Sequence, residues 1–211
     1  LVSLIRRTVG WRPGCRVLDV ACGAGRHARA LEDAGATVFG LDLSMALLRR
    51  AREATSAPLI RADMRALPVR ARSMDLTVNL FTSFGYFETD AEHAAALAEM
   101  GSTVRPGGWL VLDFLNAARV RAELVPEESA LLAGQPVSIT RSLTGVGRFV
   151  AKTIRTADGQ TFRERVRLFD ADDLRAMLRA AGIAVTHEFG DYDGGLACAP
   201  SPRVVLMGRA A

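Results

Sequence analysis

The stretch VLDVACGAGRHA, residues 17–28, decides how the rest of the chain is interpreted. Three apolar residues and Asp19 lead straight into a turn of small residues that contains Gly23 and Gly25. Glycines at such a turn let a ligand approach the backbone closely, and the helix that follows offers its amino terminus. Residues 23–28 also fit the GxGxxG/A pattern of dinucleotide-binding turns, which is a weak signal by itself.

Asp19 indicates which ligand this turn binds. The residue stands at the end of the predicted strand, beside the place where a dinucleotide puts its pyrophosphate, and a fixed carboxylate there would repel that group. A ligand with a cationic end would be attracted instead. S-adenosylmethionine is such a ligand, because it carries an ammonium and a sulfonium and has no phosphate.

Two further acids stand at the ends of the next two predicted strands, Asp42 and Asp63. One acid per β–α unit places all three at the carboxyl edge of a parallel sheet, where such folds bind ligands. Asp42 can accept both ribose hydroxyls in charge-assisted bonds. Asp63 suits the exocyclic amine of adenine, with Met64 packed on the ring. Strand-end acids also cap helices, but three in register with the glycine turn favour a ligand.

Short apolar runs alternate with helical patterns from residue 16 to residue 116. Ser44 and Asp90 are expected to cap the second and third helices, and Asp170 the last helix, with Asp173 in an acidic capping box. This alternation predicts a parallel, doubly wound α/β sheet. Its predicted strands are 16–21, 37–43, 58–63, 74–82, 109–115, 183–189 and 203–209, and its predicted helices are 26–34, 44–54, 90–104 and 170–181.

Residues 117–169 break the alternation. Three β-like segments, 136–143, 148–156 and 160–169, predict a small antiparallel β excursion inserted before the last helix. The pair Asp158-Gly159 predicts a tight hairpin. We expect one domain over residues 1–211, with the excursion acting as a lid or as the surface of a homodimer.

Composition sets the broad class. The chain has 211 residues, of which 49% are hydrophobic, and no apolar run is long enough to span a bilayer, so we expect a soluble protein without a membrane partner. The three histidines are scattered, and the cysteines Cys15, Cys22 and Cys198 form no CxxC pair, so the sequence predicts no metal site. Three unpatterned cysteines also predict no disulfide framework, and we expect a cytoplasmic protein. Because the sequence starts at Leu1 with a helix-like segment, we expect a missing N-terminal segment and an open pocket.

Five segments resemble, in order and spacing, the successive motifs of the class I S-adenosylmethionine-dependent methyltransferases. They are VLDVACGAG, GLDLS, ADM, DLTVNLFTSFGYF and RPGGWLVLDFLN, and the terminal RVVLMGR resembles the last, antiparallel strand of that family. The resemblance covers residues 16–116 and 170–209. It implies a Rossmann-like methyltransferase fold with a mostly parallel seven-stranded sheet and S-adenosyl-L-methionine as cofactor. SFGYF, the excursion and RLFDADDLRAMLRAAG resemble the small-molecule enzymes of the class.

The resemblance also implies which residues bind the cofactor. Asp19, Gly23 and Gly25 would hold the methionine part, and Asn79 with Leu80 would lie beside the sulfonium. Ala21 stands where the family often has its first glycine, and Cys22 is expected to be a small filler rather than a nucleophile. The full expected set is Asp19, Ala21, Cys22, Gly23, Gly25, Asp42, Leu43, Asp63, Met64, Asn79 and Leu80.

The methyl acceptor is less well defined by the sequence. A general base is needed only if the acceptor arrives protonated, so no catalytic residue is assigned. Residues 79–82 read Asn-Leu-Phe-Thr instead of the Asn-Pro-Pro-aromatic motif of amino-methylating nucleic-acid enzymes, which argues against DNA. The expected acceptor pocket consists of Ser83, Phe84, Tyr86, Phe87 and Tyr192.

Several alternatives stay open. The basic isoelectric point of about 9.5 allows an RNA methyltransferase, and a relative that binds the cofactor without transferring the methyl group is a second possibility. Arg163, Arg165 and Arg167 share one strand face, which is either solvated or bound to an anionic substrate under the excursion. His27 and His93 are expected to be structural, with the helix amino terminus lowering the pKa of His27.

Overall fold

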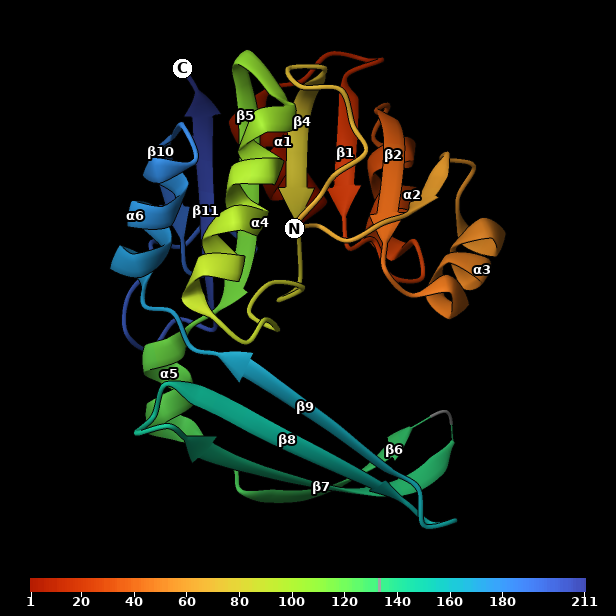
Figure 1. Ribbon diagram of the computed structural model, residues 1–211, viewed down its shortest axis with the longest axis vertical. Coiled ribbons are helices and arrows are strands. Elements are labelled where there is room, and N and C mark those ends of the chain that lie inside the picture. The colour runs from red at the N-terminus through yellow and green to blue at the C-terminus, as the bar shows by residue number, and fades with distance from the viewer. Residues whose placement is uncertain (133) are drawn as a thin grey trace.

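A seven-stranded sheet forms the centre of the computed structural model, which describes residues 1–132 and 134–211 (Figure 1). Its strands are β1 (Arg16–Val20), β2 (Thr37–Asp42), β3 (Leu59–Arg61), β4 (Met74–Asn79), β5 (Val104–Leu115), β10 (Ile183–Phe189) and β11 (Arg203–Ala210). Their order across the sheet is β10-β11-β5-β4-β1-β2-β3. Strands β1 to β5 pair in parallel, whereas β11 is antiparallel to both of its neighbours. The predicted doubly wound, mostly parallel sheet is therefore confirmed.

Helices cover both faces of this sheet. The helices are α1 (Val2–Val9), α2 (Arg26–Asp33), α3 (Met45–Ala54), α4 (Asp90–Thr103) and α6 (Ala171–Ala180). Leu4 and Leu31 from α1 and α2 pack on one face, and Leu97 and Leu174 from α4 and α6 pack on the other. Burying each such side chain contributes about 1.5–3 kcal/mol, so both faces of the sheet hold a core. None of the helices in the described part of the chain is both long and apolar enough to cross a membrane.

The helix caps differ from the prediction at one position. Ser44 caps α3 by accepting a hydrogen bond from the backbone N–H of Leu47, and Asp170 caps α6, both as predicted. Thr89, and not Asp90, caps α4, because its hydroxyl accepts from the Glu92 N–H while the Glu92 carboxylate accepts from the Thr89 N–H. A complete capping box satisfies more orphan donors than a lone aspartate. Asp90 is thereby free for a different contact.

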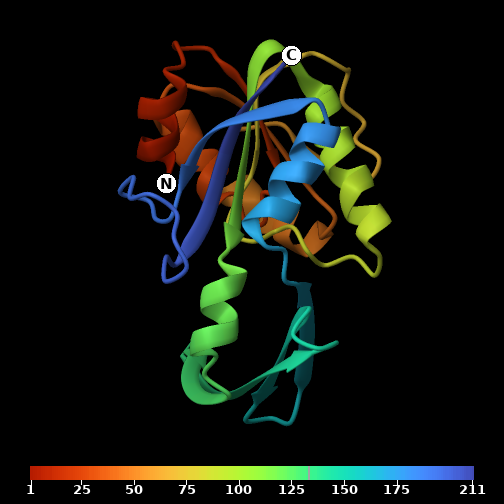
Figure 2. The ribbon, with the colours of Figure 1, turned by 90° about the vertical axis from the view of Figure 1, so that its left-hand side faces the viewer.

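Residues 117–167 form the excursion, which holds more than the three predicted strands. It begins with helix α5 (Ala117–Glu123), capped by Asn116, and continues as an antiparallel sheet in the order β6-β7-β8-β9. These strands are β6 (Glu127–Leu132), β7 (Gln135–Thr144), β8 (Phe149–Thr156) and β9 (Thr161–Arg167). The sequence indicated neither α5 nor β6, because EESALL lacks the alternation of a half-buried strand. Figures 1 and 2 show this second sheet beyond the carboxyl ends of the parallel strands. A homodimer through it stays a prediction.

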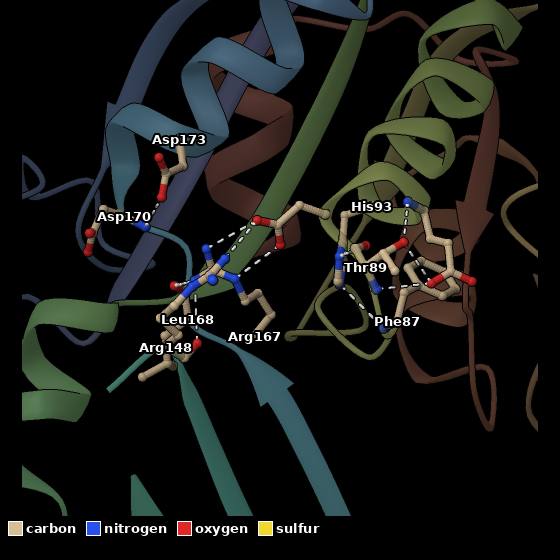
Figure 3. Close-up of polar contacts among 10 residues, drawn as sticks. Phe87, Thr89, His93, Arg148, Arg167, Leu168, Asp170 and Asp173 are labelled. Carbon is tan, nitrogen blue, oxygen red and sulfur yellow. Dashed lines mark hydrogen bonds and ion pairs between the residues drawn. The ribbon is translucent and has the colours of Figure 1, made fainter. Parts of the chain in front are cut away.

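One ion-pair cluster attaches the second sheet to helix α4, which covers the seven-stranded sheet (Figure 3). Arg167 is the last residue of β9 and lies on the same face of that strand as Arg163 and Arg165. It donates from Nε to the Asp90 carboxylate at 3.1 Å and from Nη1 to the Leu168 carbonyl at 2.6 Å. Arg148 donates to the same carboxylate at 3.0 Å. The Arg167 side chain is 10% exposed and the Asp90 side chain is 52% exposed, so only the cation of this pair is shielded from water.

We expect Arg167→Met to lower the free energy of unfolding by about 1–3 kcal/mol, because it removes the side-chain donor to the buried Leu168 carbonyl and one of the two arginines on Asp90. Urea denaturation monitored by circular dichroism measures this change. Arg163→Met on the same face of β9 is the matched control, since Arg163 is exposed and makes no ion pair in the described residues, and it should change stability by less than about 0.5 kcal/mol. Equal effects of the two substitutions would contradict the anchoring role.

Candidate functional site

The turn after β1 is built from residues with left-handed backbone. Ala21, Gly23 and Gly25 have φ values of 60°, 56° and 82°. Gly25 is also the N-cap of α2, and a Cβ at this position would lie 3.1 Å from the Cβ of Ala51 on α3. Glycine is therefore required there by both backbone and packing, while the small side chain of Ala21 tolerates the strain.

Asp19 lies beneath this turn with an unsatisfied oxygen. The residue is 1% exposed, and its Oδ2 has no hydrogen-bond partner. Burial, followed by the charge of Asp42, raises the pKa of the Asp19 carboxyl to about 7. Asn79 at the end of β4 has a second buried acceptor without a donor, its Oδ1. Because buried polar groups are almost always paired, these two oxygens fit a ligand that brings donors, such as the ammonium of S-adenosylmethionine.

The other two strand-end acids are held by local contacts. Asp42 accepts from the Gly23 N–H at 2.8 Å with one carboxylate oxygen and from the Ser44 N–H at 2.7 Å with the other, which ties the glycine turn to β2. Asp63 accepts from the guanidinium of Arg65, which lowers the pKa of its carboxyl. Each oxygen of Asp42 accepts one such bond and keeps a lone pair for a ligand hydroxyl, whereas both oxygens of Asp63 already accept from Arg65.

A cavity of about 470 Å³ lies at this carboxyl edge of the sheet. Its size is within the range of small-molecule sites. Six predicted cofactor residues line it, together with three predicted acceptor residues. The cofactor residues are Ala21, Gly23, Asp42, Leu43, Asp63 and Met64, and the acceptor residues are Ser83, Tyr86 and Phe87. Sequence reasoning missed Leu47, Phe81 and Thr82, which also line it.

Five residues expected to bind the cofactor do not line the cavity. Asp19 and Asn79 are buried, each with one unpaired oxygen. Leu80 is buried in the core under α1 and α2, and Gly25 caps α2. Cys22 contacts the backbone at Gly40, where an added Cβ would lie 3.0 Å from the Cys22 sulfur. Burial raises the pKa of the Cys22 thiol to about 12, which makes it an inert filler, as expected.

Two predicted acceptor residues are in the wrong place for that role. Phe84 is 0% exposed and packs edge-on against Phe114, so it belongs to the core and not to a rim. Tyr192 donates its hydroxyl to the Asp113 carboxylate at 2.9 Å and lines neither this cavity nor the one beside it. Aromatic residues after a strand look alike in sequence, and only the packing separates core from wall.

Asp113 at the end of β5 organises the turn that follows β4. Its fully buried carboxylate accepts from the Phe81 N–H at 2.9 Å, from Tyr192, and from Arg203 Nε at 2.8 Å. Arg203 also donates to the Thr82 hydroxyl at 2.9 Å. Phe81 and Thr82 have φ values of 59° and 60°, a conformation that is costly for a β-branched residue. The carboxylate therefore holds a strained turn in place.

A second cavity, of about 710 Å³, adjoins the first. It lies between this turn, α5 and one face of the second sheet, and it shares Phe81, Thr82 and Tyr86 with the first cavity. Its charged side chains are paired across strands or along α5, with Arg141 on Glu128 at 2.8 Å, Lys152 on Glu164 at 3.4 Å, and Arg119 on Glu123 at 2.8 Å. Val150, Val166, Leu115 and Val120 supply apolar wall.

The arginines of β9 do not line this second cavity. Glu164 and Val166 face it, so Arg163, Arg165 and Arg167 on the alternating positions face the other way. Arg165 pairs with Glu88 and Arg167 with Asp90. An anionic substrate held by these three arginines under the excursion is therefore contradicted by the geometry.

His93 is structural, whereas the structural role expected for His27 stays a prediction. Burial, followed by the charge of Arg26, lowers the pKa of His27 to about 4, so the predicted direction is right and burial is the main cause. His93 is buried, and its Nδ1 donates to the Thr89 carbonyl at 2.7 Å while its Nε2 accepts from the Phe87 N–H at 3.3 Å (Figure 3). Both ring nitrogens of His93 are thus occupied.

In residues 1–132 and 134–211 no cluster of three metal-ligating side chains occurs.

Comparison with known proteins places this site in a family. A family model described as a methyltransferase domain matches residues 17–108. A malonyl-[acyl-carrier protein] O-methyltransferase from Pseudescherichia vulneris is 32% identical over 88% of this chain and 70% of its own length. A dTDP-3-amino-3,6-dideoxy-alpha-D-glucopyranose N,N-dimethyltransferase from Streptomyces fradiae is 38% identical over 54% of this chain, which spans only 44% of that relative.

Solved structures agree with this assignment. The S-adenosylmethionine-bound amino pentose methyltransferase from Micromonospora echinaspora is 25% identical, with a TM-score of 0.73 over 100% of this chain and 88% of that one. The CcbJ methyltransferase from Streptomyces caelestis has a TM-score of 0.83 at 20% identity over 100% of this chain and 88% of that one, which shows the shared fold.

The raised pKa of Asp19 predicts a pH-dependent affinity for S-adenosylhomocysteine. The carboxyl keeps its proton up to about pH 7 in the folded protein, and only the ionised form attracts an ammonium. Affinity measured by calorimetry should therefore rise about tenfold between about pH 6 and about pH 8. By the same linkage, the free energy of unfolding of the ligand-free protein should fall as the pH rises from about 4 to about 7.

Asp19→Asn should bind more weakly and remove this pH dependence of the affinity. Asp33→Asn is the control, since Asp33 is exposed and pairs only with Arg29 on the surface of α2. A pH profile that survives in Asp19→Asn would show that another group is responsible.

Asp42→Ala should weaken S-adenosylhomocysteine binding by about 1.5–3 kcal/mol, the scale of losing hydrogen bonds to a charged group. Calorimetry at fixed pH measures the loss, and Asp33→Ala provides the matched removal of an exposed aspartate. If Asp42→Ala bound as tightly as the unaltered protein, the assignment of the ribose to Asp42 would be wrong.

Proposed function

Because the chain belongs to the class I S-adenosylmethionine-dependent methyltransferases, we propose that it methylates a small molecule held between the carboxyl edge of its large sheet and its second sheet. One observation carries the proposal. The cavity lined by Asp42 and Asp63 and the cavity under the second sheet share Phe81, Thr82 and Tyr86. A donor in the first cavity and an acceptor in the second would meet at these three residues.

In this proposal the cofactor is held by residues that line the first cavity and by Asp19, which is buried next to it. Asp19 accepts from the ammonium, Asp42 from the ribose hydroxyls, and Asp63 from the adenine amine with Met64 against the ring. When bound, S-adenosylmethionine supplies a methyl group activated on a sulfonium. The chain then needs only to hold the nucleophile in line with that methyl group and to keep water away, and positioning of this kind carries much of a rate enhancement.

The lining of the second cavity supports a metabolite of mixed polarity as acceptor. Apolar side chains from α5, β8 and β9 alternate with ion pairs whose cations are already matched by acids. A polyanion such as RNA needs unmatched cations along a continuous face. The relatives named for O-methylation and for N-methylation of a sugar amine support an oxygen or nitrogen nucleophile.

Tyr86 is suited to orient the acceptor as a hydrogen-bond donor. Burial, followed by the charge of Glu164, raises the pKa of its phenol above the ordinary value. The phenol therefore stays protonated at neutral pH and donates. It lines both cavities, which places it beside the meeting point of donor and acceptor.

A screen tests the proposal with methyl-labelled cofactor and small amines, phenols, carboxylates and bulk RNA as acceptors. We expect a small molecule to be labelled, and Val150→Trp to lower its kcat/KM by about tenfold or more, equivalent to about 1.4 kcal/mol. Val150 lines only the acceptor cavity, so affinity for S-adenosylhomocysteine should not change.

Val146→Trp is the matched control, because Val146 is fully exposed at the β7–β8 turn. It should leave both turnover and cofactor affinity unchanged. If RNA alone became labelled, and the labelling persisted in Val150→Trp, the proposed acceptor site would be wrong.

A further inference from the structure

A third cavity, of about 500 Å³, opens at the opposite edge of the large sheet. Its walls are the segment that leads into β1, the starts of β4 and β5, and the end of antiparallel β11. These are the amino ends of the parallel strands, whereas the cofactor and acceptor cavities lie at the carboxyl ends. None of its lining residues lines either of those cavities.

The cavity carries surplus positive charge. Three arginines line it, Arg12, Arg105 and Arg209, against one acid, Asp75. Asp75 is already satisfied, since it accepts from Arg105 Nε at 2.5 Å and from the Arg16 N–H at 2.8 Å. Arg12 and Arg209 form no ion pair with any acid in the described part of the chain. An anion entering here would therefore meet two arginines that have no carboxylate partner.

Both tryptophans of the chain line the same cavity. Trp109 is 7% exposed and carries the guanidinium of Arg209 at 4.5 Å from its ring centroid. Trp11 is partly exposed, and its indole N–H points to the Ala34 carbonyl at 3.4 Å. Gly107 has a φ of 73° with no atom within 4 Å of an added Cβ, so the wall is open beside the rings. An exposed indole next to arginines without a carboxylate partner favours a flat ligand with negative charge.

We propose that this cavity is a second ligand site, for a planar aromatic anion such as an aryl carboxylate or aryl phosphate. The partly exposed ring of Trp11 contacts the flat part, and Arg12 binds the anionic group together with Arg209, which rests on the buried ring of Trp109. The site is independent of methyl transfer, because it shares no residue with the cofactor and acceptor cavities.

The two tryptophans provide a direct readout, since the indole N–H groups of Trp11 and Trp109 give the only two such signals in a ¹H–¹⁵N spectrum of this chain. The probes are naphthalene-2-carboxylate and its neutral amide, added to protein saturated with S-adenosylhomocysteine so that the cofactor cavity is occupied. We expect the carboxylate to shift both indole signals in a saturable manner and to bind at least about tenfold more tightly than the amide.

Arg12→Gln and Arg209→Gln should each weaken carboxylate binding about tenfold without changing affinity for S-adenosylhomocysteine, which reports that the fold is intact. Arg163→Gln on the second sheet is the control for net charge and should have no effect. The proposal is overturned if neither indole signal shifts at about 10 mM carboxylate, a concentration far above a specific site's Kd. It is also overturned if the amide binds equally well, or if Arg163→Gln weakens binding as much as the other two substitutions.

Discussion

The buried carboxylate of Asp113 is the contact on which the arrangement of the site depends. It joins the end of β5 to the turn after β4, to β11 through Arg203, and to the loop before β11 through Tyr192. Burying a charge is expensive unless it is paired and hydrogen-bonded, and here three donors satisfy it. Those bonds offset the strain of Phe81 and Thr82, two successive left-handed residues that cost about 1–3 kcal/mol each. The wall common to the two cavities rests on this pairing.

Asp19 is also a buried aspartate, but its carboxyl is not fully hydrogen-bonded. It is as buried as Asp113, yet one of its oxygens has no donor and the pKa of its carboxyl is raised to about 7. A fold tolerates such a group where a ligand completes it, because binding then gains the hydrogen bonds that folding left unmade. The contrast distinguishes Asp113, whose donors come from the fold, from Asp19, for which we propose that a ligand supplies them.

The second sheet supplies much of the wall of the proposed acceptor cavity and none of the wall of the proposed cofactor cavity. It joins the first layer through Asn116 and α5 at one end and through Arg167 and Asp90 at the other. Its cavity-facing side chains come from β6 to β9, at alternate positions of β8 and β9, so substitutions there change the wall of this cavity and leave the strand-end acids in place. Function on such folds is decided by the site and not by the shared sheet.

The sequence by itself determined the parallel sheet and the glycine turn, because strand periodicity and a small-residue turn are local patterns. It also determined that Asp42 and Asp63 lie at one edge, because each follows a parallel strand and the carboxyl ends of parallel strands meet at the same edge of a sheet. It could not separate Phe84 in the core from Tyr86 at the wall, since both follow the same strand and only packing against Phe114 distinguishes them. Nor could it show β6, or the contacts of Asp113 with Arg203 and Tyr192. Those contacts join segments about 80 to 90 residues apart, and no local pattern specifies a pairing over that separation. Only the folded chain brings those groups together, because the buried carboxylate needs donors that its own strand cannot supply.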